Sequence, residues 1–258
     1  MPRDIRSAKA FVTSVDLSDI PRAILSQDAA TGTGEVFDAA KKQAQVVGSG
    51  MFAFAVGVTP QVREAISDSA LLAQLVATKS TSAEDNPVKW FNEYSGVLQK
   101  LGWTIQDAGW SDYSAVGQSA EVHEKIMEVL TVVLGPGAAA LPILTATVAA
   151  FKGMKSDSPW LTIFSRESQK AKIARFQVGL VEKEEGSDVF VVLLGCLIQA
   201  QNDITQVLFF KFKAARASFR ANNAKVSINR AALVELGPVI RKKTRAFQVN
   251  YVSTVLNV

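Results

Sequence analysis

The feature that most constrains this chain is a run of 23 residues, Val129–Phe151, that contains no charged side chain. Its length matches that of a membrane-spanning helix. However, Gly135-Pro136-Gly137 lies near its start, and proline removes a backbone donor and clashes with the preceding helical turn. We therefore predict two shorter helices, over about 119–134 and 138–154, that meet at the Gly-Pro-Gly sequence.

The second of these helices is apolar on most faces, which is a property of helices that lie in a core or in a membrane. One interpretation is an apolar helical hairpin buried within a domain. The other is a hairpin that leaves the core and enters a bilayer. The candidate lipid-contacting residues in that case are Leu134, Leu141, Ile143, Leu144 and Phe151.

Charge divides the chain at about the same place. Residues 151–258 hold 17 Lys and Arg against 8 Asp and Glu, a net charge of +9, whereas residues 1–150 hold 11 against 16, a net charge of −5. A basic half suggests an anionic partner such as a lipid surface, nucleic acid or an acidic protein. A solvated basic face that balances the acidic half is the alternative.

Residues 1–157 read as mostly helical. A helix is expected from Glu35 into a second uncharged tract, Gln43–Val62. Two further helices are predicted where an N-cap residue precedes a proline, at 59–60 and at 86–87. Residues 103–110, with a tryptophan at each end, are expected to be extended.

Residues 158–258 read as β-rich, and four segments and one pair of short segments have strand-like composition or alternation. These segments are 160–164, 171–182, 189–201, 207–213 and a pair, 217–220 with 225–228, joined across Asn222-Asn223. A closing helix follows Asn229 and is expected to restart at Pro238, after Gly237. The predicted fold is a single α+β domain over 1–258, with a helical half, a buried apolar hairpin and an antiparallel meander of four to six strands backed by a C-terminal helix.

The basic residues of the closing helix form a candidate anion-binding site. Arg241, Lys242, Lys243 and Arg245 come shortly after the expected restart, where the helix macrodipole is unfavourable for cations. A bound anion would be stabilising there, and simple solvation of the four side chains is the alternative.

The residue inventory argues against most enzyme classes. With one histidine, His123, and one cysteine, the chain has no zinc site of the usual ligand count unless several carboxylates take part. No G-x-S-x-G, phosphate-loop or dinucleotide-binding motif is present. The basic and aromatic residues of 209–220 lack the core of the RNA-recognition signature, so nucleic acid is not the expected partner. We predict a non-enzymatic protein without a cofactor.

Cys196 lies within an apolar strand and is either a small buried side chain or an acyl attachment point. A single cysteine in such a strand, a helical front half, a basic β-rich rear half and no signal peptide resemble the Erwinia virulence factor Evf family over about 200 residues. The strings LLAQL at 71–75 and LFFKF at 208–212, together with the stretch from Trp90 to Trp103, resemble an uncharacterised bacterial family. The Evf resemblance implies a palmitoyl thioester on Cys196 and association with membranes.

We therefore predict a membrane-associating bacterial protein of the toxin or virulence-factor type, in which a basic region adds to apolar contact with lipid. The alternative is a soluble interaction or oligomer-forming protein whose apolar segments are core. The expected partner is accordingly a lipid membrane, a protein or further copies of the chain. The N-terminal sequence MPRDIRSAKAFV lacks the apolar core of a signal peptide. Cytoplasmic synthesis, followed by membrane association or signal-independent export, is expected.

Overall fold

The computed structural model describes residues 4–20, 36–81, 86–113, 121–135, 138, 140–182, 186–209 and 217–258. The described strands form an eight-stranded sheet in the order β3-β7-β6-β5-β2-β1-β8, with β4 paired to β5. The elements follow one another as α1 (Ile5–Ser14), β1 (Gln43–Val47), β2 (Gly50–Phe54), α2 (Pro60–Ser80), α3 (Pro87–Lys100), β3 (Thr104–Asp112), α4 (Val122–Leu134), α5 (Ala140–Gly153), α6 (Pro159–Ser168), β4 (Gln169–Lys170), β5 (Ile173–Val181), β6 (Asp188–Ala200), β7 (Ala217–Asn229), α7 (Arg230–Thr244), the 3-10 turn η2 (Arg245–Phe247), α8 (Gln248–Tyr251) and β8 (Leu256–Asn257).

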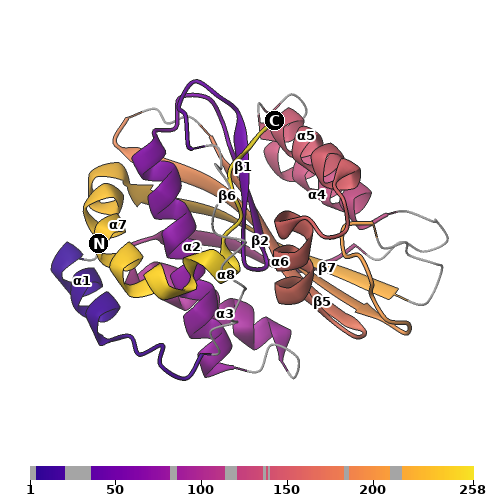
Figure 1. Ribbon diagram of the computed structural model, residues 1–258, viewed down its shortest axis with the longest axis horizontal. Coiled ribbons are helices and arrows are strands. Elements are labelled where there is room, and N and C mark those ends of the chain that lie inside the picture. The colour runs from indigo at the N-terminus through magenta and orange to yellow at the C-terminus, as the bar shows by residue number, and fades with distance from the viewer. Residues whose placement is uncertain are drawn as a thin grey trace.

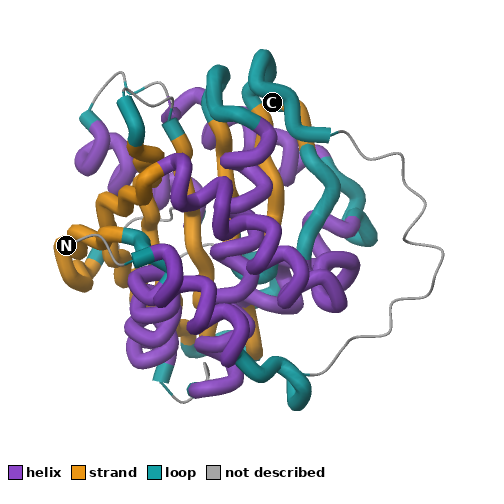
Figure 2. Tube along the Cα trace, turned by 90° about the vertical axis from the view of Figure 1, so that its left-hand side faces the viewer, coloured by secondary structure: helices purple, strands orange, loops and turns teal. Residues whose placement is uncertain are grey.

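Helices cover both faces of the sheet (Figure 1). We call α1, α2, α3 and α7, which lie on one face, the α2 layer, and α4, α5 and α6, which lie on the other, the hairpin layer. In Figure 2, where the α2 layer is turned toward the viewer, its helices lie in front of the strands. Along β6, Leu193 joins the core under the α2 layer and Cys196 joins the core under the hairpin layer. This alternation is expected of a strand that is buried on both faces.

The predicted α+β class is confirmed, and β5, β6 and β7 form an antiparallel meander as expected. The sheet is wider than predicted because the first 157 residues contribute three strands. β1 and β2 lie where a helix was expected, and β3 overlaps residues 103–110, which were expected to be extended. β2 pairs with β5 in parallel, and this pair joins the strands of the two halves.

The predicted helix through residues 43–54 is wrong, because this segment forms the β1–β2 hairpin. Val47 pairs with Gly50, so Gly48 and Ser49 make a two-residue turn, with Gly48 at φ +53°. Glycine adopts this conformation at no steric cost. Both strands are buried at every residue, including the polar Gln43 and Gln45 of β1, and β2 has no polar side chain. A Gly-Ser pair between two apolar runs is the hairpin signal that could have found them.

The strand predicted at 160–164 is also wrong, because these residues lie in α6. Ser158 stands at the N-cap position and Pro159 is the first helical residue. The same signal correctly predicts α2 and α3. Trp160, Ile163 and Phe164 then fall on one buried face, at the i, i+3, i+4 spacing of a helix.

β7 is one unbroken strand, and the two short strands expected across Asn222-Asn223 are wrong. β7 pairs with β6 from Ala217 to Asn229, so the long neighbouring strand holds both asparagines in the ladder. Of the strand expected over 207–213, residues 207–209 lie in a turn and 210–213 lie outside the described residues.

α7 continues through Gly237 and Pro238, so the expected restart at Pro238 is wrong. The small residue at 237 lets α7 lie close to α2. A Cβ at Gly237 would stand 3.1 Å from the Cβ of Ala65. Close packing on α2 supports the helix across the position where proline cannot donate a backbone hydrogen bond.

Buried polar contacts join α2 to the β1–β2 hairpin. Arg63 is fully buried, and its guanidinium donates to the carbonyls of Val58 and Ala55 and to Gln43 Oε1, at 2.6 to 2.9 Å. The side chain of Gln74 donates to the β1 backbone at 2.8 Å. Burial lowers the pKa of Arg63 to about 10, which leaves it charged at neutral pH. A buried charge is tolerated here because it is fully hydrogen-bonded.

Candidate membrane-contacting surface

α4 and α5 form the helical hairpin expected from the uncharged sequence. α4 begins with a capping box, in which Glu121 and Glu124 each accept a backbone N–H of the other. α4 ends at Leu134, where the cap residue Gly135 has a positive φ of 86°. The part of the first predicted helix before residue 121, and residues 136, 137 and 139 of the connection, lie outside the described residues.

The five residues predicted to contact lipid divide into two groups. Ile143, Leu144 and Phe151 are at most 2% exposed and belong to the core under the hairpin layer. Leu134 and Leu141 are half-buried at the edge of that core. Of the five, only Leu134 and Leu141 can meet a membrane while the hairpin remains on the sheet.

The outward face of the hairpin is uncharged and partly apolar from Val129 to Phe151, whereas the first two turns of α4 expose Glu124 and Glu128. Val132 is 76% exposed. Lys152 and Lys155 are exposed where α5 ends. We call this outward face the hairpin surface; its described exposed and half-exposed residues are Thr131, Val132, Val133, Leu134, Leu141, Pro142, Thr145, Ala146, Ala149 and Ala150.

Apolar packing holds the hairpin against the sheet. In the part of the chain that the structure describes, no hydrogen bond joins α4 or α5 to a strand. Among the described residues, the polar contacts that α4 and α5 make outside the hairpin are with the turn after β6. There the backbone N–H of His123 donates to Leu208 O at 3.0 Å, and the Lys152 ammonium lies 5.9 Å from the Phe209 ring centre. The inner face of α5 therefore depends on non-directional contacts.

Cys196 lies on β6 and is fully buried in the core under the hairpin layer. Burial raises the pKa of its thiol well above the ordinary value, so the reactive thiolate is disfavoured while the hairpin layer is in place. Acyl attachment at Cys196 stays a prediction.

The four basic residues predicted to bind an anion lie at the C-terminal end of α7 and in η2. Arg241, Lys242 and Lys243 occupy the last turn of α7, where the macrodipole favours cations, so the reason given for a bound anion does not hold. Arg241 Nε donates to the buried carboxylate of Asp68 at 2.9 Å, which links α7 to α2. Lys242 and Arg245 are exposed. Anion binding by this group stays a prediction.

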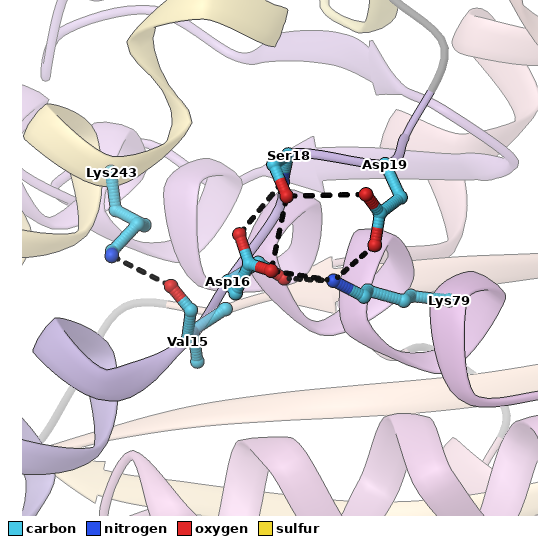
Figure 3. Close-up of polar contacts among 6 residues, drawn as sticks. All are labelled: Val15, Asp16, Ser18, Asp19, Lys79 and Lys243. Carbon is cyan, nitrogen blue, oxygen red and sulfur yellow. Dashed lines mark hydrogen bonds and ion pairs between the residues drawn. The ribbon is translucent and has the colours of Figure 1, made fainter.

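Lys243 takes part in a set of polar contacts that fastens the segment after α1 (Figure 3). Its ammonium donates to the carbonyl of Val15 at 2.7 Å. On the other side of this segment, Lys79 at the end of α2 pairs with Asp16 at 3.0 Å and Asp19 at 3.1 Å. The hydrogen bond from the backbone of Ser18 and the contact with Lys79 lower the pKa of Asp16 to about 2.

Two further properties bear on function. Within the described ranges, no three His, Cys, Asp or Glu side chains gather as a metal site would require. Among the same residues, no helix has both the length and the apolar character needed to cross a bilayer.

The structure resembles solved structures named as toxins or virulence factors. A delta-endotoxin matches with a TM-score of 0.41 and 14% identity, over 70% of this chain and 80% of that chain. The activated Cyt2Ba monomer from Bacillus thuringiensis subsp. israelensis matches with a TM-score of 0.41 and 16% identity, over 70% of this chain and 97% of that chain.

The Evf virulence factor matches over 98% of this chain and 91% of that chain, with a TM-score of 0.34 and 9% identity. This match agrees with the resemblance expected from the sequence. No protein-family model and no curated protein matches the chain.

Proposed function

We propose that this chain is a non-enzymatic, membrane-associating protein of the toxin or virulence-factor type, and that the hairpin surface is where it meets lipid. The observation that carries the proposal is the outward face of α4 and α5, which is uncharged from Val129 to Phe151 and leaves Val132 76% exposed. Apolar surface gathered on one exposed face is a feature of sites that contact another protein or a membrane.

The length of the helices favours contact within the interface over a span. α5 has 14 residues and is therefore about 21 Å long, against the ~30 Å of a hydrocarbon core. A helix of this length lies in the plane of the membrane with one face among the lipid chains. Lys152 and Lys155, exposed where α5 ends, would attract anionic headgroups and supply the second binding signal.

The contacts of α5 also allow a larger response. Because no hydrogen bond joins α5 to the sheet among the described residues, lifting the hairpin would break apolar contacts and leave no buried polar group of α5 without its partner. Lipid would replace those contacts with others of the same kind. Ile143, Leu144 and Phe151 would then reach the membrane as well.

Flotation with liposomes tests the proposal, with neutral and anionic vesicles at low and high salt. The wild type is expected to float with anionic vesicles and to be released only in part by salt. Val132→Glu is expected to reduce vesicle binding by about tenfold or more, because a carboxylate in the acyl region costs more than ~1.4 kcal/mol. The substitution leaves the fold intact because the side chain is already exposed, and circular dichroism checks this.

Val249→Glu is the matched control, because Val249 is 56% exposed and lies on α8, outside the hairpin layer. It is expected to float as the wild type does. The proposal is overturned if the wild type stays at the bottom with every vesicle. If Val132→Glu and Val249→Glu lose vesicle binding equally, the hairpin surface is not the specific site of lipid contact.

The alternative function is a soluble interaction or oligomer-forming protein that uses the same surface. Sedimentation velocity without lipid separates the two. If the wild type self-associates and Val132→Glu is monomeric, the hairpin surface is an interface between copies. If both are monomeric and only the wild type floats, lipid is the partner.

The acyl group proposed for Cys196 is tested by the intact mass of protein purified from its bacterial host. The expected result is a mass increase of one fatty acyl chain that Cys196→Ser and hydroxylamine both remove, since hydroxylamine cleaves thioesters. An unmodified mass in the host ends the acyl proposal and leaves the hairpin proposal standing.

A further inference from the structure

On the opposite face of the sheet, a cavity of about 170 Å³ lies between α3 and the strands β3, β5, β6 and β7. Its floor follows one row across three strands, because Gln177 pairs with Gly195 and Gly195 pairs with Asn222. Because Gly195 has no side chain, the cavity is deepest at the middle of this row. Phe91 of α3 packs there, and a Cβ at 195 would stand 3.0 Å from its ring.

The two amides that flank Gly195 each carry a buried polar atom with no hydrogen-bond partner among the described residues. These atoms are Gln177 Nε2, a donor, and Asn222 Oδ1, an acceptor. The Asn222 amide is oriented by its other end, since Asn222 Nδ2 donates to Asp107 Oδ2 at 3.2 Å. Gln177 Oε1 accepts from Ser49 Oγ at 3.3 Å, and Ser49 Oγ shares its single hydrogen with Gln74 Oε1 at 3.3 Å. Buried polar atoms in native proteins are usually paired, and each of these two lacks a partner that a ligand could supply.

The remaining lining limits the chemistry of that ligand. Phe91, Tyr94 and Leu193 provide aromatic and apolar surface, and Asn92, Ser95 and Gln99 provide neutral polar groups at α3. Asp107 is the only charged residue in the described lining, and no basic side chain is present to pair with a phosphate or a carboxylate. The volume holds roughly five to six waters at ~30 Å³ each, which is the room of one sugar ring.

We propose that this cavity binds a single neutral sugar, such as the terminal residue of a glycan. A pyranose presents hydroxyl groups that both donate and accept, which suits the free donor of Gln177 and the free acceptor of Asn222. It also has an apolar C–H face that suits Phe91 and Tyr94. The inference does not depend on the proposed membrane function, because the cavity and the hairpin surface lie on opposite sides of the sheet.

Gly96 of α3 gives a direct way to fill the cavity. Gly96 lines it, and a Cβ at this position would have no heavy atom within 4 Å. Gly96→Leu should therefore occupy the cavity while the helix keeps its packing. Gly153→Leu is the matched control, because Gly153 is a helical glycine with equally open surroundings, at the end of α5.

The experiment is saturation-transfer NMR on the full chain without lipid, using the methyl glycosides of glucose, galactose and mannose and methyl N-acetylglucosaminide, followed by titration calorimetry of any that respond. At least one glycoside is expected to bind with a millimolar dissociation constant. Gly96→Leu is expected to abolish the signal, and Gly153→Leu is expected to retain it.

Gln177→Met, which removes the free donor at nearly constant volume, is expected to weaken binding by about tenfold. If Gly96→Leu does not fold, Gln177→Met tests the sugar-binding proposal in its place. The proposal is overturned if none of the four glycosides gives a signal with the wild type. It is equally overturned if a folded Gly96→Leu or a folded Gln177→Met binds as tightly as the wild type.

Discussion

The two helical layers pack on the same sheet by different means. α2 in the α2 layer is tied to the β1–β2 hairpin by buried hydrogen bonds, because Gln74 donates to Val47 O of β1 and Arg63 donates to Gln43 Oε1 of β1 and to Ala55 O, directly after β2. It is tied to α7 by the pair between Asp68 and Arg241. In the hairpin layer, α5 packs through apolar side chains such as Leu144, and none of its described residues makes a hydrogen bond to the sheet.

This difference determines what each layer can do. Removing α2 from the sheet would leave a buried charge and several carbonyls without partners, at roughly 1–3 kcal/mol for each unpaired polar group. Removing α5 would expose apolar surface, which is costly in water and not in lipid. The α2 layer therefore has the character of a fixed scaffold, and the hairpin layer is the one suited to exchange its contacts.

The largest expected effect comes from breaking the polar contacts of the α2 layer. Arg63→Met should lower the free energy of unfolding by about 3–5 kcal/mol, because the carbonyls of Val58 and Ala55 lose their buried donor. Urea denaturation measures the change. Arg245→Met, which alters an exposed arginine, is the control and should change stability by less than about 0.5 kcal/mol. If Arg63→Met changes the free energy of unfolding by as little as Arg245→Met does, the buried hydrogen bonds of Arg63 do not hold the α2 layer on the sheet.

A smaller effect should be seen in the native protein without substitution. Amides of α5 should exchange with deuterium through local opening about tenfold faster than those of α3, a difference of ~1.4 kcal/mol. α3 is the matched reference because both helices have 14 residues, and α3 belongs to the α2 layer. Hydrogen exchange read by mass spectrometry measures this difference. Equal protection of α3 and α5 would contradict a hairpin layer that opens on its own.

The smallest effect concerns the exposed contacts that fasten residues 15–19 to the α2 layer. The pKa of Asp16 is lowered from 3.8 to about 2, so its contribution to stability is present above pH ~4 and is lost as the pH falls through about 2. Denaturation of the wild type and of Asp16→Ala should therefore differ slightly near neutral pH and converge near pH 2. A difference that does not vary with pH would show that the charge of Asp16 plays no part.

Local sequence signals predicted a large part of the fold. Pro60 and Pro87 located the starts of α2 and α3, and the Gly-Pro-Gly sequence located the division between α4 and α5. Alternation located β5, and the long apolar run located β6. The β1–β2 hairpin was missed because the alternation in β1 is limited to Gln43 and Gln45 and β2 has no polar side chain. A short apolar run of this kind does not separate a strand from a buried helix.

The candidate sites were predicted less completely. The uncharged run at 129–151 did identify the hairpin, but not which of its residues face outward, since a helix apolar on most sides carries no such information. The sequence did not single out Gln177 and Asn222, because they lie 45 positions apart and become neighbours of Gly195 only through strand pairing. The sequence placed the basic residues 241–245 near the start of a helix, whereas they lie at the end of α7 and in η2. The difference arises because α7 packs on α2 and continues through Pro238.

The sequence by itself determined the α+β fold class of this protein and where most of its helices begin. It also determined that residues 129–151 carry no charge and that the two halves of the chain differ in net charge. These properties depend on residues close together in the chain, through capping, periodicity and backbone restriction. The tertiary structure alone decided that helices cover both faces of one mixed sheet, that α2 is held by buried polar groups and α5 is not, and that a cavity with two unpaired amides lies beneath α3. Each of these depends on contacts between residues far apart in sequence, and the same local pattern is compatible with several such arrangements.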